Sequence, residues 1–544
     1  MHYIAGMHHF IIQYCCLLAV IVFVVMLAQK IKVAYPILLV VAGIGLGFVP
    51  ALQNISIDPD LIFVIIFPPL LYEAAWNTSW KELWKWRRII TSFAFPVVII
   101  TSTVIAFIAA WLIPGFTLAT GFLLGGIISP PDAVSASAIL KNMTVPKRLS
   151  TVIEGESLLN DAASLVIFRF ALATVITGQF VFSHAALSFL VVIVMGIACG
   201  IAVGLLFYAI HRWLPTTTNI DIILTFLTPY AMYMVAESLG FSGVLAVVSG
   251  GLFLSARRDT FLTHRSRLQG INVWEAIAFV LNGFVFMLIG LEFPVIIKGL
   301  GPGGIGAAIK YSLLISGVVI VTRMLSTYGA VLFTMFMSHF ITVADPTPGW
   351  KAPLLLGWAG MRGVVSLAAA LSIPVMINTG TPFPQRSMLI FITFAVIVVT
   401  LLLQGLTLPL LIRWANMPDP DYTISMEQQQ QLVRKKLAAR SLQLLNDKYQ
   451  QETEHNELVR SLKSKLEADM ELLNDWKKDG GRERSDEFYH DYRIILDEMR
   501  TEQRQLLKML NKKEGINDDI IRDQLELLDI EEEKMRRHFL HRDG

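Results

Sequence analysis

The chain has 544 residues, of which 54% are hydrophobic and 16% are charged, and its formal net charge is +2. Because an average soluble protein carries about 25% charged residues, this composition excludes an ordinary soluble domain. The hydrophobic residues are concentrated before residue 412, in runs near the ~20 residues that cross a bilayer, so the sequence predicts a polytopic membrane protein. The three cysteines form no CxxC or Cys/His grouping and therefore indicate neither a disulfide framework nor a zinc site.

Thirteen segments are predicted to cross the membrane. They cover residues 10–29, 33–50, 60–77, 89–113, 117–140, 155–178, 184–211, 219–238, 241–256, 271–297, 304–337, 352–378 and 387–412. Lys and Arg are divided unequally between the alternate loops, with fifteen in one set and three in the other. By the positive-inside rule the loops with fifteen are cytoplasmic, which places the N-terminus outside and the C-terminus inside.

The fifth segment, 117–140, contains the sequence "GGIISPPDAV". Pro130 and Pro131 remove two backbone donors and interrupt the helix. In a membrane, the carbonyl groups freed in this way are tolerated only where they face protein or a water-filled cavity. Asp132 follows directly, and packing alone gives a poor reason for a carboxylate at such a break.

The sixth segment opens with "EGESLLNDAASLVIF", residues 154–168. Ser157 and Asp161 are four residues apart and share one helix face, and Glu156 and Asn160 share the adjacent face. Ionisable side chains in a membrane segment mark a functional site by default. We expect the first face, together with Asp132, to bind an ion, and the second face to contact a structural partner.

The twelfth segment, 352–378, has Arg362 at its middle. The residues that make its helix breakable are Gly357, Gly360, Gly363 and Pro374. If segments 1–6 and 8–13 are inverted repeats, the fifth and twelfth segments correspond, and paired interrupted helices point to a transporter. A buried arginine needs a carboxylate, so we expect Arg362 to pair with Glu156 beside Asn160.

Further charges lie in the predicted membrane segments. They are Glu73, Arg169, Glu237, Glu275 and Arg323. Glu73, Glu275 and Arg323 are secondary candidates for the site. We expect Arg323 to pair with Glu275 or Glu73 and so to hold helices together.

The tail, residues 416–544, is charged, with leucines every three or four residues, a period that predicts amphipathic helices. One apolar stripe consists of Leu458, Leu462, Leu466, Met470 and Leu473. The tail has no GxGxxG loop and shows no clear resemblance to a known family. We expect a cytoplasmic helical domain, regulatory or oligomerising, that packs on itself or on a second copy; a coiled coil or a ligand-sensing module is the alternative.

Four stretches of the membrane segments resemble a known family. They are "FPPLLYEAAWN" (67–77), "ISPPDAV" (128–134), "GESLLNDA" (155–162) and "GWAGMRGVVSLAAAL" (357–371). The family is that of monovalent cation:proton antiporters of the sodium/proton exchanger, NhaP-like type. The resemblance implies an all-α fold of about thirteen membrane helices in two inverted repeats with two crossing discontinuous helices. It further implies a homodimer in the lipid of a bacterial plasma membrane, with Na+, K+ or Li+ and H+ as ligands and neither a cofactor nor a nucleic acid.

The same resemblance implies roles for single residues. Asp161 binds the cation and the proton, and Asp132 and Ser157 help to bind the cation. Glu156, Asn160 and Arg362 form the supporting cluster. Pro131 stands where relatives often have Thr, so only a backbone carbonyl replaces that side-chain ligand, and the preference between Na+ and K+ stays open.

The predicted function is exchange of a monovalent cation for H+ by competition at Asp161, as part of pH homeostasis. Asn160 carries no proton and Arg362 cannot release one, so we expect one-for-one, electroneutral exchange. A cation channel or uniporter is one alternative, although discontinuous helices favour alternating access. An intramembrane aspartyl protease using Asp132 and Asp161 is another, although neither residue lies in a GxGD context.

Overall fold

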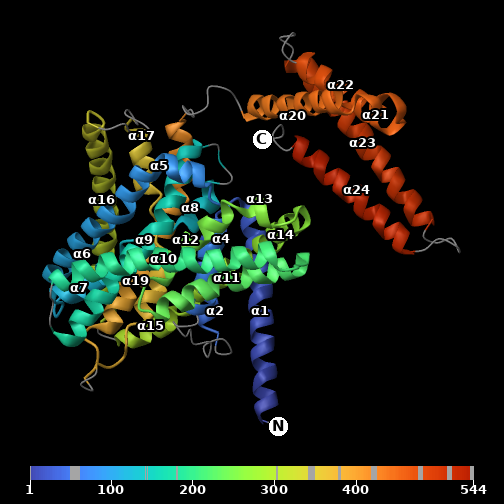
Figure 1. Ribbon diagram of the computed structural model, residues 1–544. Helices are drawn as coiled ribbons and strands as arrows, with labels where there is room; N and C mark the ends of the chain where they lie inside the picture. The colour runs from blue at the N-terminus through green and yellow to red at the C-terminus, as the bar shows by residue number, and fades with distance from the viewer. Residues whose placement is uncertain are drawn as a thin grey trace. The chain divides into compact units, whose positions relative to one another are not determined.

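The computed structural model of the chain describes residues 2–49, 62–140, 143, 145–178, 182–301, 304–340, 349–377, 381–417, 426–475, 482–510 and 518–539. The chain divides into two compact units, Met1–Asp419 and Pro420–Gly544 (Figure 1). Within the described ranges all regular structure is helical apart from one isolated bridge between Met376 and Pro382. The predicted all-α class is therefore confirmed.

The first unit has a helix in each of the thirteen predicted segments. The helices are α1 (His2–Ile31), α2 (Tyr35–Gly47), η2 (Ile62–Ile66), α4 (Phe67–Asn77), α5 (Trp80–Ser92), η3 (Phe93–Val97), α6 (Val98–Leu112), α7 (Leu118–Ile128), α8 (Ala133–Leu140), α9 (Lys147–Thr177), α10 (Phe182–Trp213), α11 (Thr218–Ser238), α12 (Gly243–Ser255), α13 (Arg258–Phe261), α14 (His264–Leu291), α15 (Phe293–Leu300), α16 (Ile305–Met337), α17 (Lys351–Trp358), α18 (Val364–Leu371) and α19 (Arg386–Ala415). Nine helices among the described residues are long and apolar enough to cross a membrane, and three shorter apolar helices accompany them. The count of thirteen crossings and the inverted repeats stay predictions.

Three predicted segments begin or end at positions that the structure does not describe. Residue 50, residues 60–61 and residue 378 lie outside the described ranges. Several helices begin earlier than the predicted segments, among them α1 at His2, α5 at Trp80, α9 at Lys147 and α14 at His264. The helix expected from residue 89 starts at Trp80, where Ser79 caps it by accepting a hydrogen bond from the Glu82 amide at 3.5 Å. The first residues of α5 include several charged side chains, so a prediction from apolar runs does not include them.

Prolines and glycines shape the helices around the centre of the unit. The π-helical turn η3 contains Pro96, and the wider turn accommodates a residue that has no backbone donor. Gly121 and Gly125 let α7 lie directly on α6, since an added Cβ would stand 2.4 Å from the Ala106 carbonyl oxygen and 2.5 Å from that of Ser102. Small residues four apart are the usual means of close helix packing in membranes. The same contact places the end of α7 in the buried interior.

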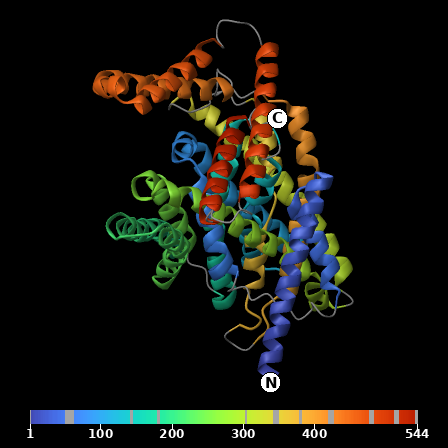
Figure 2. The same cartoon turned by 90° about the vertical axis from the view of Figure 1, so that its right-hand side faces the viewer.

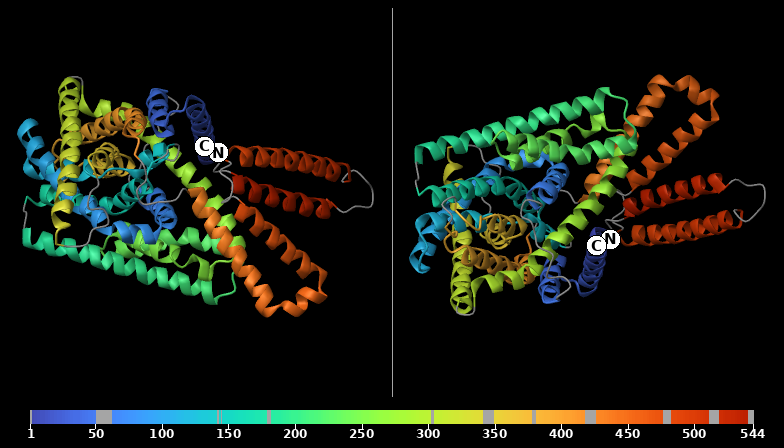
Figure 3. Two further views of the ribbon diagram at one scale, coloured as in Figure 1. Left: turned by 90° about the horizontal axis from the view of Figure 1, so that it is seen from above. Right: turned by 90° about the horizontal axis from the view of Figure 1, so that it is seen from below.

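The second unit consists of amphipathic helices. They are α20 (Met426–Lys448), α21 (Gln450–His455), α22 (Glu457–Asp475), α23 (Arg482–Leu510) and α24 (Asp518–Phe539). Helix α20 packs on α22, and α23 lies beside α24, as Figures 2 and 3 show. Arg504 of α23 pairs with Asp529 of α24 at 2.5 Å, and the pKa of Arg504 is raised by its hydrogen bonds to Asp529 and Glu532. The tail thus forms helical pairs of its own.

Candidate functional site

The predicted break in the fifth segment is present. Helix α7 ends at Ile128 and α8 begins at Ala133, with Pro130 and Pro131 between them. The break frees carbonyl oxygens, and side chains from other helices satisfy them. The Asn160 amide nitrogen donates to the Pro131 oxygen at 3.1 Å, and Arg362 donates from Nε to the Ile128 oxygen at 2.9 Å. Asn160 and Arg362, two of the candidate residues in the sequence, therefore hydrogen-bond the carbonyl groups freed at this break.

The twelfth segment is broken as well. Helix α17 ends at Trp358, α18 begins at Val364, and Arg362 lies in the non-helical stretch between them. Its guanidinium also donates to the Ser129 oxygen at 3.2 Å and to the Gly360 oxygen, and its backbone amide donates to the Thr400 hydroxyl of α19 at 3.2 Å. Arg362 thus ties one break to the other.

The two breaks also meet directly. The backbone amide of Asp132 donates to the Met361 oxygen at 2.7 Å. Gly363 lies against the Asp132 carboxylate, where an added Cβ would stand 2.2 Å from Oδ2, so only glycine fits there. Discontinuous helices that cross at their breaks leave polar backbone at the centre of a membrane unit, which is where transporters place their ligands.

Asp132 and Asp161 have different surroundings. The Asp132 carboxylate caps α8, since Oδ1 accepts from the Val134 amide at 2.9 Å and Oδ2 accepts from the Ser135 hydroxyl at 3.2 Å. Asp161 is 7% exposed, and among the described residues no donor hydrogen-bonds its carboxylate. The charges of the two aspartates act on each other. Asp161 is therefore a buried carboxylate whose oxygens are available to a ligand.

Ser157 connects the two aspartates. Its hydroxyl oxygen accepts from the Ala133 amide at 3.2 Å, which places it at the start of α8 beside Asp132. It also lies one helical turn before Asp161 on α9. The structure thus brings together the four predicted ligand positions, Asp161, Asp132, Ser157 and the Pro131 carbonyl.

The expected partner of Glu156 was wrong. Glu156 is 1% exposed and forms a two-pronged ion pair with Arg323 of α16, at 2.5 Å and 2.6 Å, and Arg362 instead binds carbonyl oxygens. The expectation that Arg323 pairs with Glu275 or Glu73 was wrong for the same reason. Spacing along one helix shows which residues share a face, but the packing of helices decides which arginine reaches that face.

The remaining charges are not all remote from this cluster, since the charges of Glu73 and Asp132 both act on Tyr35 of α2. Glu73 is half-buried and accepts a hydrogen bond from the Asn77 amide at 2.6 Å, and Glu275 is exposed on α14. Arg169 pairs with Glu237 at 2.7 Å, as expected of charges that hold helices together. Residues that sequence reasoning missed are Thr400, Ser135 and the Met361 carbonyl; hydroxyls and backbone groups of this kind gave no signal in an apolar segment.

Two interrupted helices that meet beside buried carboxylates define a secondary transporter as the class of protein. The family model described as "Sodium/hydrogen exchanger, transmembrane" matches residues 17–414. The chain belongs to the sodium/hydrogen exchanger family. This is a family of transporters, so neither the channel nor the protease alternative is favoured.

Named relatives and a solved structure agree with this membership. A protein named "Uncharacterized Na(+)/H(+) exchanger" from Mycobacterium tuberculosis (strain CDC 1551 / Oshkosh) is 32% identical over 521 residues, 95% of this chain and 94% of its own. The "Sodium, potassium, lithium and rubidium/H(+) antiporter" of Bacillus pumilus (strain SAFR-032) is 33% identical over 422 residues, 76% of this chain and 62% of its own. The sodium proton antiporter MjNhaP1 from Methanocaldococcus jannaschii shares the fold, with a TM-score of 0.59 and 18% identity over 74% of this chain and 97% of that chain.

The extent of the mycobacterial match corrects one expectation about the tail. A match over 95% of this chain includes most of the residues after 415. The tail therefore does resemble the corresponding part of a relative, although the amphipathic repeat alone did not show it.

Proposed function

We propose that this exchanger moves a monovalent cation in one direction and H+ in the other by letting both compete for the Asp161 carboxylate. The observation that carries the proposal is the state of Asp161, which is buried and has no hydrogen-bond donor among the described residues. A buried carboxylate without a donor is costly to keep charged, so it favours a bound cation or a proton.

The surrounding oxygens suit a hard monovalent cation. Asp161, Asp132 and Ser157 supply carboxylate and hydroxyl oxygens, and the Pro131 carbonyl keeps a second lone pair beside the one that Asn160 uses. Oxygen ligands are what Na+, K+ and Li+ prefer. The names of the relatives are consistent with Na+ as one substrate and with K+ and Li+ as others.

The charges of the buried groups support exchange of one ion for one proton. With both aspartates ionised, Glu156, Asp132 and Asp161 carry three negative charges, and Arg323 and Arg362 carry two positive charges. The sum is −1, so one monovalent cation or one proton makes the group neutral. A neutral centre crosses between inward-facing and outward-facing states at lower cost than a charged one.

The supporting residues divide into two tasks. Asn160 and Arg362 hold the helix breaks by hydrogen-bonding their carbonyl groups, and Glu156 with Arg323 joins α9 to α16. Neither Asn160 nor Arg362 releases a proton in the cycle, because a side-chain amide does not titrate and the guanidinium stays charged.

The remaining features of the proposal concern the whole chain. The loops rich in Lys and Arg lie in the cytoplasm of a bacterial cell, the protein is a homodimer in the plasma membrane, and the tail modulates exchange. All the proposed ligands precede residue 420, so a chain that ends at residue 419 is expected to keep measurable exchange.

A flux assay tests the function. In proteoliposomes that contain the purified protein, an inward Na+ gradient is expected to raise the luminal pH and an outward Na+ gradient to lower it. Asp161→Asn is expected to abolish this response while eluting as a single folded species. Full activity in that variant would refute competition at Asp161. Cation flux without any proton flux would show a uniporter.

A further inference from the structure

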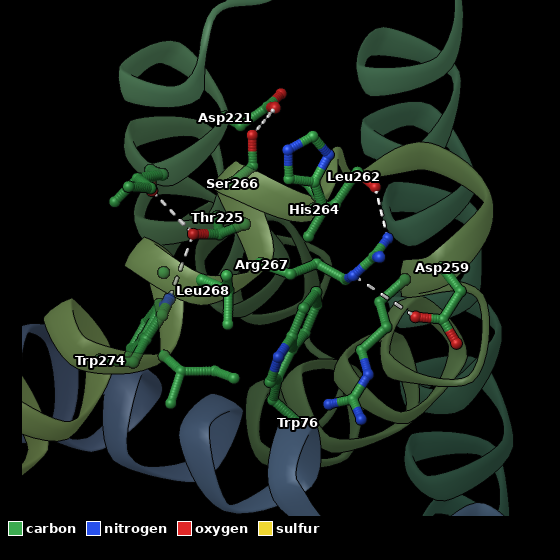
Figure 4. A pocket seen from close by; sticks show the side chains of 14 residues that line it. Trp76, Asp221, Thr225, Asp259, Leu262, His264, Ser266, Arg267, Leu268 and Trp274 are labelled. Atoms are coloured by element: carbon green, nitrogen blue, oxygen red, sulfur yellow. Dashed lines mark hydrogen bonds and ion pairs between the residues drawn. The ribbon is translucent and has the colours of Figure 1, made fainter. Parts of the chain in front are cut away.

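A cavity lies away from the proposed exchange site. It has a volume of about 330 Å³ and is lined by the end of α4, the start of α11, α13 and the start of α14 (Figure 4). None of the residues around Asp161 or Asp132 lines it. Trp76, Arg258, His264, Arg267, Leu268 and Trp274 form the part of its wall that matters here, and we call it the arginine cavity.

The arginine cavity is lined by two arginines and two aspartates, and the segment around its arginines is basic as a whole. Residues 256–270 contain four arginines and one aspartate, a net charge of +3 with His264 neutral. Arg267 donates to the Leu262 oxygen at 2.7 Å and lies 3.6 Å from Asp259, whose side chain is 81% exposed. An ion pair so exposed contributes little, so Arg267 can turn to another anion.

Arg258 is freer still. The structure gives its side chain no hydrogen bond, ion pair or ring contact with the described residues, although it lines the cavity and is half-buried. Two guanidinium groups at one cavity suit a phosphate, because the planar fork matches two phosphate oxygens at once.

The wall also holds two aspartates, of which Asp259 forms, among the described residues, only the exposed pair with Arg267 and Asp221 is held by other partners. Both carboxylate oxygens of Asp221 are engaged, one with His211 Nδ1 at 3.0 Å and the other with the Ser266 hydroxyl at 2.7 Å. The same contacts join α10, α11 and α14, so the wall of the cavity is held rigidly. Its floor is held too, since Trp274 donates from Nε1 to the Thr225 hydroxyl at 3.1 Å.

The rest of the wall is apolar and opens outward. Leu268 is 55% exposed and Ile271 is 42% exposed, and both line the cavity from α14, a helix that continues into the apolar unit. Figure 4 shows the Trp76 and Trp274 rings on the side of the cavity away from His264. Tryptophans are enriched at the boundary between headgroups and acyl chains. A soluble anion gains nothing from this apolar wall.

We infer that the arginine cavity binds the headgroup of an anionic phospholipid from the adjoining leaflet. Arg258 and Arg267 hold the phosphate, and an acyl chain runs along Leu268 and Ile271 of α14. Basic pockets between membrane helices are the usual sites for such headgroups.

Native mass spectrometry of the full chain in detergent tests this inference with three probes: dioleoylphosphatidylglycerol, dioleoylphosphatidylcholine and inorganic phosphate. The first is expected to bind more tightly than the second. Arg258→Gln is expected to weaken binding of phosphatidylglycerol about tenfold, the effect of losing one charge-assisted hydrogen bond. Arg265→Gln is the matched control, because it removes the same charge from the first turn of α14 but from a residue that does not line the cavity.

Three outcomes would overturn the inference. Equal losses in Arg258→Gln and Arg265→Gln would show attraction by surface charge alone. Equal affinity for the two lipids would remove the role of the arginines. Inorganic phosphate that displaces the lipid at equal concentration would identify a site for soluble phosphate. If Arg258→Gln does not fold, Arg267→Gln takes its place. The readout is binding, so it does not depend on the proposed exchange at Asp161.

Discussion

The two buried arginines differ in what they bind, although both lie in the centre of the membrane unit. Arg323 is 2% exposed and neutralises one carboxylate, that of Glu156. Arg362 is 0% exposed and has no ion pair among the described residues; it donates to three carbonyl oxygens at two helix breaks. The first arginine balances a charge, and the second replaces hydrogen bonds that the interrupted helices lost.

This difference matters for transport because the two kinds of contact depend differently on the positions of the helix breaks. The Glu156–Arg323 pair joins α9 to α16 through side chains alone. The contacts of Arg362 depend on the exact position of two breaks, so they fix the geometry in which Asp132 stands beside α9.

The largest expected effect on stability is that of Arg323→Ala. It leaves Glu156 charged and unpaired inside the protein, and truncation of one partner of a buried pair costs about 3–5 kcal/mol. Thermal unfolding of the purified variant measures this loss. The double variant Glu156→Gln with Arg323→Gln should recover much of the stability, because no unpaired charge remains. A double variant as unstable as Arg323→Ala would mean that the pair does not account for the loss.

A smaller effect is expected from Arg362→Lys. The variant keeps the positive charge but cannot present a planar fork to three carbonyl groups, and the loss of one charge-assisted hydrogen bond costs about 1.5–3 kcal/mol. Exchange should fall as well, because the side chain at position 362 no longer joins the two breaks by the same hydrogen bonds. Arg323→Lys is the matched control: a lysine still pairs with Glu156, so its loss should be smaller. Equal losses in the two lysine variants would remove the distinction between the arginines.

Much of this centre follows from the sequence. Hydropathy indicated where the helices lie, the Pro130–Pro131 pair indicated the first break, and four-residue spacing put Ser157 and Asp161 on one face. The partner of Glu156 did not follow, because Arg323 and Arg362 are both lone arginines in apolar segments. Only the packing of α16 against the rest of the unit separates them. The resemblance to the antiporter family supplied the roles of the aspartates, and these roles remain proposals.

No effect at all is expected from a membrane potential. Asp161 is the single competing carboxylate, so one proton leaves for each cation that binds and no net charge moves. A potential of 100 mV is worth about 2.3 kcal/mol per elementary charge and would bias an electrogenic cycle strongly. Potassium diffusion potentials of either sign, imposed on proteoliposomes during Na+-driven pH change, should leave the rate unchanged. Rates that follow the sign of the potential would show that Asp132 also cycles a proton.

The central claim is that a cation and a proton displace each other at Asp161. Its most direct measurement is proton release by purified protein in weakly buffered detergent solution when NaCl is added, with choline chloride as the control salt. In the unaltered protein we predict saturable proton release that approaches one proton per bound Na+. At saturating Na+, Asp132→Asn should release the same number of protons per bound Na+. Asp161→Asn should release none. Undiminished release from Asp161→Asn, or Na+ binding to the unaltered protein without release, would contradict the account.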